Sequence, residues 1–331
     1  MATKKNARRA VIVAGRRTPF VRAFGPLMKI DTIALGTAAV RGLIESQNLA
    51  QRDIEGIVWG GVILPGTSPN VGREIALDLG MPAVEAMTVS RACASGLQAI
   101  TLAAAAIERG DADVMIAGGS DSTSNAEVKL PQKWVHALAP LAFGKATAAD
   151  VLGVLSQLTP LTDLIPKRPE IAERSTGQLM GEAAEEMAGR NEISREAQDE
   201  FTARSHARAA AAIASGRFDE EIVPVKSDSG KWVHVDQIVR ADTSVEKLGK
   251  LRPVFSKTGT LTAGNSSALT DGGAAVLLME ESRARALGYT PLAAIKSWSY
   301  VGVDPADQLL MGPALAMPAA LAVLAALAVL A

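Results

Sequence analysis

Cys93, the single cysteine of this 331-residue chain, is its first candidate for chemistry. It lies in VSRACASGLQAI, where a strand-like run ends, small residues follow and an alanine-rich helix pattern begins. A thiol at the start of a helix faces the positive end of the helix dipole and unpaired N–H groups, both of which favour the thiolate. A strand-to-helix elbow also leaves its backbone N–H free for a developing oxyanion. The setting favours a nucleophile, but a lone cysteine in an apolar chain is more often an inert core residue, and spacing alone leaves both open.

The composition excludes several other kinds of site. A single cysteine forms neither an intrachain disulfide nor a thiolate cluster, and His136, His206 and His234 lack metal-ligand spacing. The 34 Lys and Arg residues nearly balance the 35 Asp and Glu residues, so a net charge of -1 gives no electrostatic footprint for nucleic acid. We therefore expect a cytoplasmic, metal-free protein with no nucleic-acid partner and with surface or structural roles for its histidines.

Alternating strand and helix patterns surround Cys93. Strands are expected over residues 11–14, 57–64, 86–89 and 114–117, and helices over 31–46, 71–79 and 95–109. Asp31 suits the N-cap of the first helix, and Gly110 is the stop signal of the last. Repeated alternation predicts an α/β fold with an open sheet covered by helices on both faces. The helix after Cys93 contains LQAITLAAAAI, which is apolar nearly all round and predicts burial on more than one side.

The alternation stops between about residues 126 and 251. This stretch holds an amphipathic pattern at 148–158, helix patterns that start near Ser175 and Ser194, and a hairpin turn at 228–230. Alternation then resumes with a glycine-rich stretch, a strand, a helix and the strand-like LAAIKSWSYVGV. We predict an N-terminal core domain at 1–125, an inserted loop domain at 126–255, and the start of a second, incomplete core domain at 256–331.

The last eighteen residues, 314–331, are all apolar. Their length meets the criterion for a transmembrane helix, but Pro318 interrupts the run, no basic residue flanks its far end, and alanine contributes little to insertion. We interpret the tail as an altered C-terminus or as a segment in which the natural side chains are not faithfully represented. We expect membrane contact to be at most peripheral. The basic start, MATKKNARRA, lacks the apolar region of a secretory signal.

SRACASGLQAI resembles the nucleophile motif of thiolases, and the similarity extends to about Pro318. VIVAGRRTPF, IAGGSDS, MGEAAEEMA, ISREAQDEFTARSHARA and GTLTAGNSSALTDGGAAVLLM are similar to successive segments of that family. The wordings TVSRACA, NSSALTDG and LMGPA are most similar to long-chain 3-ketoacyl-CoA thiolases, the β subunits of fatty-acid oxidation complexes. The resemblance implies a layered αβαβα core with an inserted loop domain.

The resemblance also implies roles for particular residues. Cys93 would be the acyl-accepting nucleophile, and Ser267 would bond a pantetheine amide of coenzyme A, which is a substrate and not a cofactor. The remaining contacts, which would line the pantetheine and acyl tunnel, are Ala263, Phe255, Leu269 and Met180. The stretch 264–269 fits a capped turn as well as a ligand site, and Met180 fits core filling equally.

The sequence departs from the family downstream of the GPA turn. Thiolases need a histidine or asparagine in an E-A-F motif, a histidine in a G-H-P motif and a second cysteine in a C-x-G-G motif, and this sequence has none of them. The reaction implied is cleavage of 3-ketoacyl-CoA by coenzyme A, in fatty-acid β-oxidation, through an acyl-enzyme on Cys93. The alternatives are a biosynthetic acetoacetyl-CoA thiolase, condensation of the 3-ketoacyl synthase kind, and an inactive CoA-binding or scaffold subunit.

The resemblance implies protein partners as well. Thiolases are homodimers or tetramers, and similar β subunits pair with a hydratase/dehydrogenase α subunit. The candidate contact surface is PQKWVHALAPLAFGKATAADVLGVLSQL, with Trp134, Leu138, Leu141 and Phe143. A lid over the acyl tunnel is the equal alternative for this stretch.

Overall fold

The structure of the chain is a computed structural model that describes residues 8–127, 131–144, 147, 151, 153 and 172–329. The chain forms two compact units, one of residues 126–172 and one of residues 1–125 together with 173–331. Residues 173–255 therefore cluster with the core strands, and the division into three domains stays a prediction.

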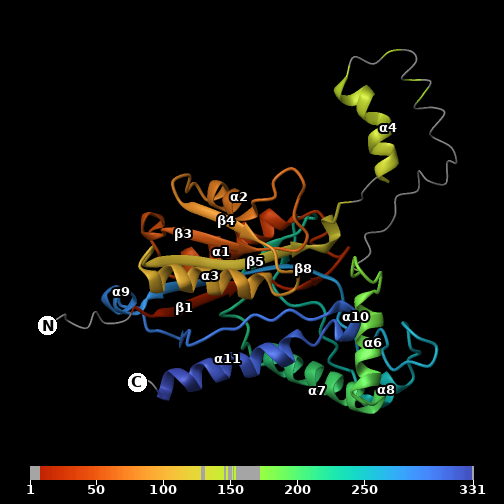
Figure 1. The fold of residues 1–331 in the computed structure, drawn as a ribbon. Coiled ribbons are helices and arrows are strands. Elements are labelled where there is room, and N and C mark those ends of the chain that lie inside the picture. Colours follow the sequence, from red (N-terminus) through yellow and green to blue (C-terminus); the bar gives the residue numbers. More distant parts are fainter. Residues whose placement is uncertain are drawn as a thin grey trace. The chain divides into compact units, whose positions relative to one another are not determined.

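A seven-stranded mixed sheet forms the centre of the larger unit (Figure 1). Its order is β4-β3-β5-β8-β1-β9, and β2 pairs with β8. The neighbours of β3 are parallel to it, whereas β8 runs antiparallel to both β5 and β1. The strands are β1 Ala10–Arg17, β2 Val21–Arg22, β3 Gly56–Gly60, β4 Glu85–Val89, β5 Val114–Ser122, β8 Thr270–Glu280 and β9 Ala293–Ala294.

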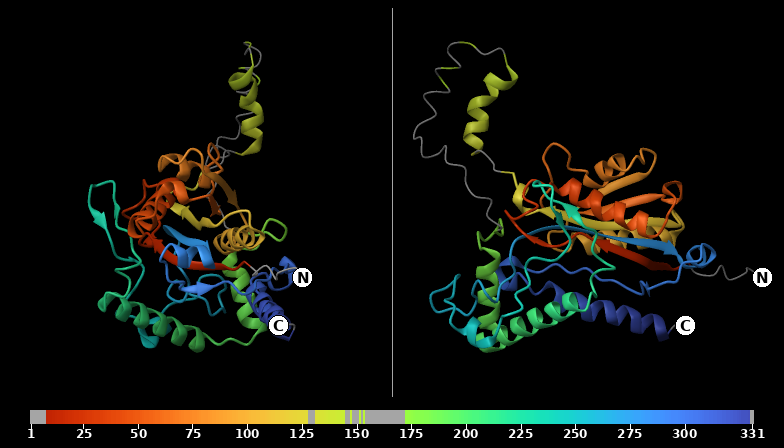
Figure 2. Two further views of the ribbon diagram at one scale, coloured as in Figure 1. Left: turned by 90° about the vertical axis from the view of Figure 1, so that its left-hand side faces the viewer. Right: turned by 180° about the vertical axis from the view of Figure 1, so that it is seen from behind.

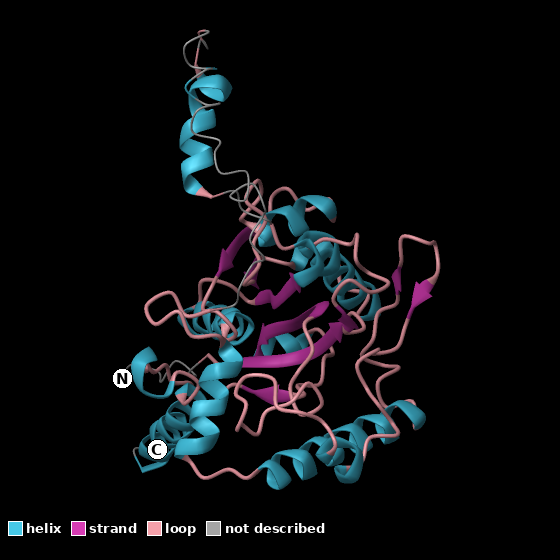
Figure 3. Ribbon diagram, turned by 90° about the vertical axis from the view of Figure 1, so that its right-hand side faces the viewer, coloured by secondary structure: helices cyan, strands magenta, loops and turns pink. Residues whose placement is uncertain are grey.

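Helices cover both faces of this sheet, as predicted (Figure 3). They are α1 Thr32–Ser46 and α2 Val71–Asp78 on one face and α3 Ser95–Arg109 on the other. Side chains of β5 alternate between the two layers, so that Ile116 packs with Trp59 and Leu43 while Ala117 packs with Ala103. The two cores thus lie on opposite faces of one sheet.

The predicted ends of α1 and α3 are confirmed. Asp31 accepts a hydrogen bond at 2.8 Å from the backbone N–H of Ala34, which satisfies one of the free donors of the first turn of α1. Gly110 ends α3 with φ +88°, a left-handed conformation that costs glycine little. Local capping interactions therefore fix the start of α1 and the end of α3.

Burial of α3 on more than one side is only partly observed. Leu97 is 64% exposed and Leu102 is 37% exposed, although Ala99 and Ala103 are completely buried against the sheet. In the segment after β9, Trp298 also packs against this core. The apolar sequence of α3 correctly predicted a buried helix, but the described residues leave part of its outer surface open.

Three strand predictions are wrong in extent or place. The strand expected over 57–64 ends at Gly60, and only two residues of LAAIKSWSYVGV form β9. The strand expected to open a second core is β8, yet it lies in the first sheet between β5 and β1. Pairing with β5 on one edge and with β1 on the other gives most of its backbone groups partners, which a strand at a new sheet edge would lack.

The larger unit also contains short helices, the long helices α6, α7 and α11, and a separate two-stranded hairpin. The α7 N-cap is Ser194 as predicted, whereas the helix expected near Ser175 begins at Met180. The hairpin at 228–230 is confirmed and stands apart from the main sheet (Figure 2). These elements are α6 Met180–Arg190, α7 Arg195–Ala214, β6 Val225–Lys226, β7 Trp232–Val233, α8 Val245–Gly249, α9 Glu281–Ala286, α10 Pro305–Gln308 and α11 Gly312–Val329.

The apolar C-terminal run forms α11, which contains Pro318. Among the residues that the structure describes, no helix combines the length and apolarity needed to cross a membrane.

The smaller unit, 126–172, contains α4 Gln132–Phe143. The amphipathic pattern expected at 148–158 lies outside the described residues except for 151 and 153, and the side chains of Trp134 and Phe143 also lie outside them.

We predict that Gly118→Ala destabilises the protein. A Cβ at this position of β5 would lie 2.2 Å from the backbone oxygen of Ala274 and 2.6 Å from the Trp59 ring, so the sheet or the core must shift, at a cost of about 3 kcal/mol. Denaturant unfolding measures the change. The matched control is Gly189→Ala in α6, where the added Cβ meets nothing within 4 Å and alanine stabilises the helix by up to about 1 kcal/mol. Equal unfolding midpoints for the two variants would contradict this packing.

Candidate active site

Cys93 lies exposed in the tight turn between β4 and α3. The residue before it, Ala92, has φ +45°, a left-handed conformation that costs a residue with a Cβ about 1 kcal/mol or more. The strain is therefore located directly beside the thiol. A strained, sharply bent strand-to-helix turn is the arrangement that presents a nucleophile at a surface.

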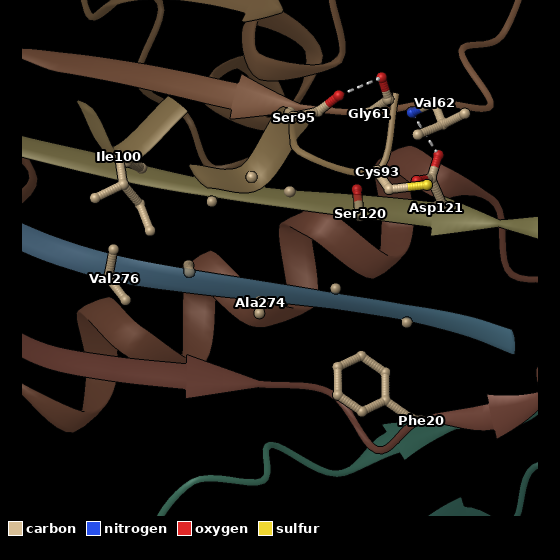
Figure 4. A pocket seen from close by; sticks show the side chains of 18 of the residues that line it. Phe20, Gly61, Val62, Cys93, Ser95, Ile100, Ser120, Asp121, Ala274 and Val276 are labelled. Carbon is tan, nitrogen blue, oxygen red and sulfur yellow. Dashed lines mark hydrogen bonds between the residues drawn. The ribbon is translucent and has the colours of Figure 1, made fainter. Parts of the chain in front are cut away.

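The buried hydroxyl of Ser95 closes this turn from the inside. Its Oγ accepts a hydrogen bond at 2.8 Å from the N–H of Arg91 and lies 2.6 Å from the carbonyl oxygen of Ala92. It also lies 3.5 Å from the carbonyl oxygen of Gly61, at the end of β3 (Figure 4). A hydroxyl carries one proton, so Ala92 is its main acceptor and Gly61 is the weaker alternative.

A second cluster supports the turn from the outside. Arg91 donates through Nε to Gln98 at 2.7 Å, and its guanidinium carbon lies 4.5 Å from the centre of the Tyr300 ring. The Tyr300 hydroxyl accepts a 3.0 Å bond from Gln98 Nε2 and also bonds to the Thr101 hydroxyl. Sequence reasoning missed this cluster because nothing local indicates that Tyr300 meets the turn around residue 91.

A cavity of about 370 Å³ opens beside Cys93. Eleven of its twenty lining residues are glycine or alanine, so the sheet backbone forms much of its wall. Larger apolar side chains border it, namely Phe20, Val62, Ile100 and Val276 (Figure 4). The volume and apolar lining suit a small acyl group better than a charged ligand.

Asp121 provides the only carboxyl group among the described residues that line this cavity. Its Oδ1 accepts hydrogen bonds from the N–H groups of Val62 at 2.9 Å and Ile63 at 2.6 Å. Burial raises the pKa of Asp121, while these two hydrogen bonds oppose the rise. Sequence reasoning did not single out this residue, although it lies in IAGGSDS, and its acidic side chain near a strand end was the available signal.

None of the five residues predicted to contact coenzyme A or the acyl chain lines this cavity. Ser267, Ala263 and Leu269 are exposed on the turn that leads into β8. The ring of Phe255 packs on the start of α6, where a Cβ added to Gly181 would lie 2.1 Å from it. The structure thus places Phe255 beside the first turn of α6, which begins at Met180.

Asn265 holds the turn before β8 in place. Its Oδ1 accepts a 2.7 Å hydrogen bond from the N–H of Thr262, and its Nδ2 donates to the buried Asp199 of α7 at 2.9 Å. Asp199 also pairs with Arg195 at 2.7 Å. These bonds match the capped-turn interpretation of Asn265, whereas Ser267 lies exposed two residues further on.

Glu185 ties the same turn to α6. Its carboxylate accepts hydrogen bonds from the N–H of Thr260 at 2.6 Å, the Thr260 hydroxyl at 2.9 Å and the N–H of Leu261 at 3.0 Å. Burial by itself would raise the pKa of Glu185, but the bonds from Leu261 and Thr260 together outweigh it and lower the pKa.

None of the three histidines is among the described residues that line the cavity. His136 contacts Gln132 within α4, His206 accepts a 3.2 Å bond from the N–H of Arg240, and His234 is exposed after β7. In the described part of the chain, no group of His, Cys, Asp and Glu side chains is arranged to hold a metal ion.

The fold and the site together define a class of protein: an α/β protein whose exposed cysteine lies on a strained elbow beside an apolar cavity. Residues 10–282 match the family model described as thiolase, N-terminal domain. The chain belongs to the thiolase family.

Curated relatives support this membership over nearly the whole chain. The 3-ketoacyl-CoA thiolase of Shewanella halifaxensis is 39% identical over 323 residues, which cover 96% of this chain and 73% of the relative. The 3-ketoacyl-CoA thiolase of Pseudoalteromonas atlantica is 41% identical with the same coverage. This chain therefore spans about three quarters of the length of these relatives.

Solved structures share the fold. The acetyl-CoA acetyltransferase of Bacillus anthracis superposes with a TM-score of 0.81 at 31% identity, covering 96% of this chain and 77% of that one. Human mitochondrial 3-ketoacyl-CoA thiolase in complex with CoA gives a TM-score of 0.79 at 28% identity, covering 95% of this chain and 75% of that one. The chain therefore has the thiolase type of α/β fold.

We predict that Ser95→Ala destabilises the elbow. The substitution leaves the N–H of Arg91 and the carbonyl of Ala92 without their shared partner. Because both bonds are partly buried, the free energy of unfolding should fall by about 1–3 kcal/mol. Denaturant unfolding provides the measurement. The control is Ser215→Ala, whose exposed hydroxyl donates to Ala212 at the end of α7 and should change stability by less than about 0.5 kcal/mol. A loss no larger than that of the control would rule out the hydroxyl as the closure of the turn.

We predict that Glu185→Gln weakens the protein in a pH-dependent way. A lowered pKa means that Glu185 stabilises the fold above its unfolded pKa and loses that contribution as the pH falls through its folded pKa. The variant should therefore be less stable at neutral pH, by about 1 kcal/mol, because the amide keeps an acceptor oxygen but loses the charge that strengthens three partly buried hydrogen bonds. The difference should vanish in acid. Urea unfolding at several pH values tests this, with Glu45→Gln on the exposed side of α1 as control. A pH-independent difference would contradict the assignment.

Proposed function

We propose that this chain is an acetyl-CoA acyltransferase that cleaves 3-ketoacyl-CoA with coenzyme A in fatty-acid oxidation. The observation that carries the proposal is the exposed thiol of Cys93 on a strained elbow at a cavity of about 370 Å³. Its family membership and the relatives named 3-ketoacyl-CoA thiolase supply the substrate class.

In the proposed reaction the sulfur of Cys93 attacks the 3-keto carbon of the substrate. The bond between C2 and C3 then breaks, its electron pair passes to the acetyl-CoA enolate, and the enolate takes up a proton at C2. The thiol of coenzyme A next attacks the acyl-enzyme, forms the shortened acyl-CoA and releases Cys93. Both attacks place negative charge on oxygen, and the amide-rich start of α3 beside Cys93 is suited to stabilise it.

We propose the acyl-accepting step for this chain. No histidine and no second thiol is among the described residues that line the cavity. A second candidate follows from this observation, namely a subunit that binds CoA thioesters without completing their cleavage.

We propose Ser267, Ala263, Leu269, Phe255 and Met180 as contacts for coenzyme A and the acyl chain. The exposure of Ala263, Ser267 and Leu269 on the turn before β8 supports this, because these side chains are accessible to a ligand. The complex of human mitochondrial 3-ketoacyl-CoA thiolase with CoA supports coenzyme A as the ligand class.

We further propose a cytoplasmic homodimer or tetramer that needs no cofactor and pairs with a hydratase/dehydrogenase α subunit. The resemblance of TVSRACA, NSSALTDG and LMGPA to β subunits of oxidation complexes supports this assembly. Apolar side chains such as Leu97 and Leu102 remain exposed on α3 and are suited to cover by protein.

The test of the proposed function is acylation of the single cysteine. The full chain is incubated with acetoacetyl-CoA or a long-chain 3-ketoacyl-CoA, and intact mass reports the acyl adduct. We expect an adduct on the wild type, none on Cys93→Ala, and release of acyl-CoA when coenzyme A is added. Malonyl-dependent condensation without thiolysis would contradict the proposal, and CoA binding without any adduct would favour the second candidate.

A further inference from the structure

The 61–64 loop, which follows β3, forms part of the cavity wall and is contacted from two sides. Gly61 and Val62 both line the cavity. On one side, the Ser95 hydroxyl approaches the carbonyl of Gly61; on the other, Asp121 accepts a hydrogen bond from the N–H of Val62 (Figure 4). Asp121 also accepts a hydrogen bond from the N–H of Ile63. The loop therefore links the elbow that carries Cys93 to the end of β5.

Asp121 holds this loop without a cation. Among the described residues, no Lys, Arg or His lies within ion-pair distance of its carboxylate. Two backbone N–H groups on consecutive residues satisfy Oδ1 instead, and charge-assisted bonds of this kind are stronger than neutral ones. The partly buried carboxylate of Asp121 is thus stabilised by the loop N–H groups that it holds in place.

We propose that Asp121 is a positioning residue for the reaction at Cys93. Its carboxylate fixes the 61–64 loop so that the cavity keeps the width through which an acyl donor reaches the sulfur. The substrate in this assignment rests on the proposed function. The positioning role itself concerns how a pantetheine arm reaches the thiol of Cys93.

Asp271 on the neighbouring strand provides a matched control. It is completely buried and also clamps a loop, through the N–H of Ser124 at 2.9 Å and the Ser124 hydroxyl at 2.5 Å. In the sheet register Asp121 pairs with Gly272, one residue away, yet Asp271 does not line the cavity. A general effect of removing a buried carboxylate at this end of the sheet would appear in both variants.

The ionisable groups at this end of the sheet are few. Among the described residues they include Asp31 at the start of α1, Asp271 on β8, and Arg91 and Cys93 in the turn before α3. Arg22 lies on β2 opposite Thr270, and Arg17 at the end of β1 pairs with Asp236, which also accepts a hydrogen bond from the N–H of Phe20. The bond of Asp31 to Ala34 and the bonds of Asp271 to Ser124 occupy those two carboxylates elsewhere.

The experiment measures two reactions of Cys93 in the full chain, with its single cysteine read by intact mass. Iodoacetamide reports the intrinsic reactivity of the thiol, and a pantetheine-linked bromoacetamide reports passage of a substrate-sized arm. Acylation by a 3-ketoacyl-CoA is followed in parallel. The variants are Asp121→Ala, Asp121→Asn and the control Asp271→Asn, each checked by thermal unfolding.

We expect Asp121→Ala to slow the pantetheine probe and acylation about 10- to 100-fold, because small displacements of a positioning wall have effects of this size. The iodoacetamide rate should stay within about twofold, since the thiol itself is unchanged. Asp121→Asn should recover to within about threefold of wild type, because an amide oxygen also accepts two hydrogen bonds. Asp271→Asn should change neither the rate of the pantetheine probe nor the rate of acylation relative to the iodoacetamide rate.

A pH series adds a readout that a purely structural role would not move. Burial raises the pKa of Asp121, so its charge is lost at a higher pH than for an ordinary aspartate. The ratio of wild-type to Asp121→Asn rates for the pantetheine probe should therefore fall towards one as the pH is lowered.

Two outcomes would overturn the proposal: equal slowing of both probes in Asp121→Ala, or the same selective loss in Asp271→Asn. Selective loss for the pantetheine probe with no acylation even in the wild type would keep the positioning role and refute the proposed function instead.

Discussion

The sharp turn between β4 and α3 is the constraint on which the site depends. Ala92 adopts φ +45° there, and the buried Ser95 hydroxyl bridges Arg91 and Ala92 to hold the bend. Without that bond two backbone groups near the core lose their partner, and the bend loses the interaction that offsets its strain. The exposure of Cys93 is thus a product of a strained backbone held by one hydroxyl.

The sheet turns this local bend into a site. β3 and β5 run parallel and end beside the elbow, so the loop after β3 and Asp121 on β5 meet there. β8 enters between β5 and β1 and contributes glycines and alanines to the cavity wall. Small side chains on two adjacent strands leave space in front of the sheet, and α3 and Phe20 border it. Local strain and long-range pairing are both required.

Sequence patterns predicted the elements near Cys93 well, because their signals are local. The Asp31 side chain caps α1, the left-handed backbone of Gly110 ends α3, and the hairpin turns at 228–230, so each feature depends on residues within a few positions. The same patterns misplaced β8, since an apolar strand pattern does not identify the strand with which it pairs. The five residues predicted for coenzyme A and the acyl chain lie outside the cavity beside Cys93, and their role stays a proposal.

The amino-acid sequence was enough to predict the nucleophile candidate, its place at a strand-to-helix elbow and the α/β class, because each depends on residue type and short-range spacing. The family came from the resemblance of whole motifs such as SRACASGLQAI. Only the tertiary structure decided that Asp121 fixes the 61–64 loop, that Tyr300 meets Arg91, and that β8 completes the first sheet. Those pairings join residues tens to hundreds of positions apart, and they form only when burial of the whole sheet compensates the entropy of closing such long loops.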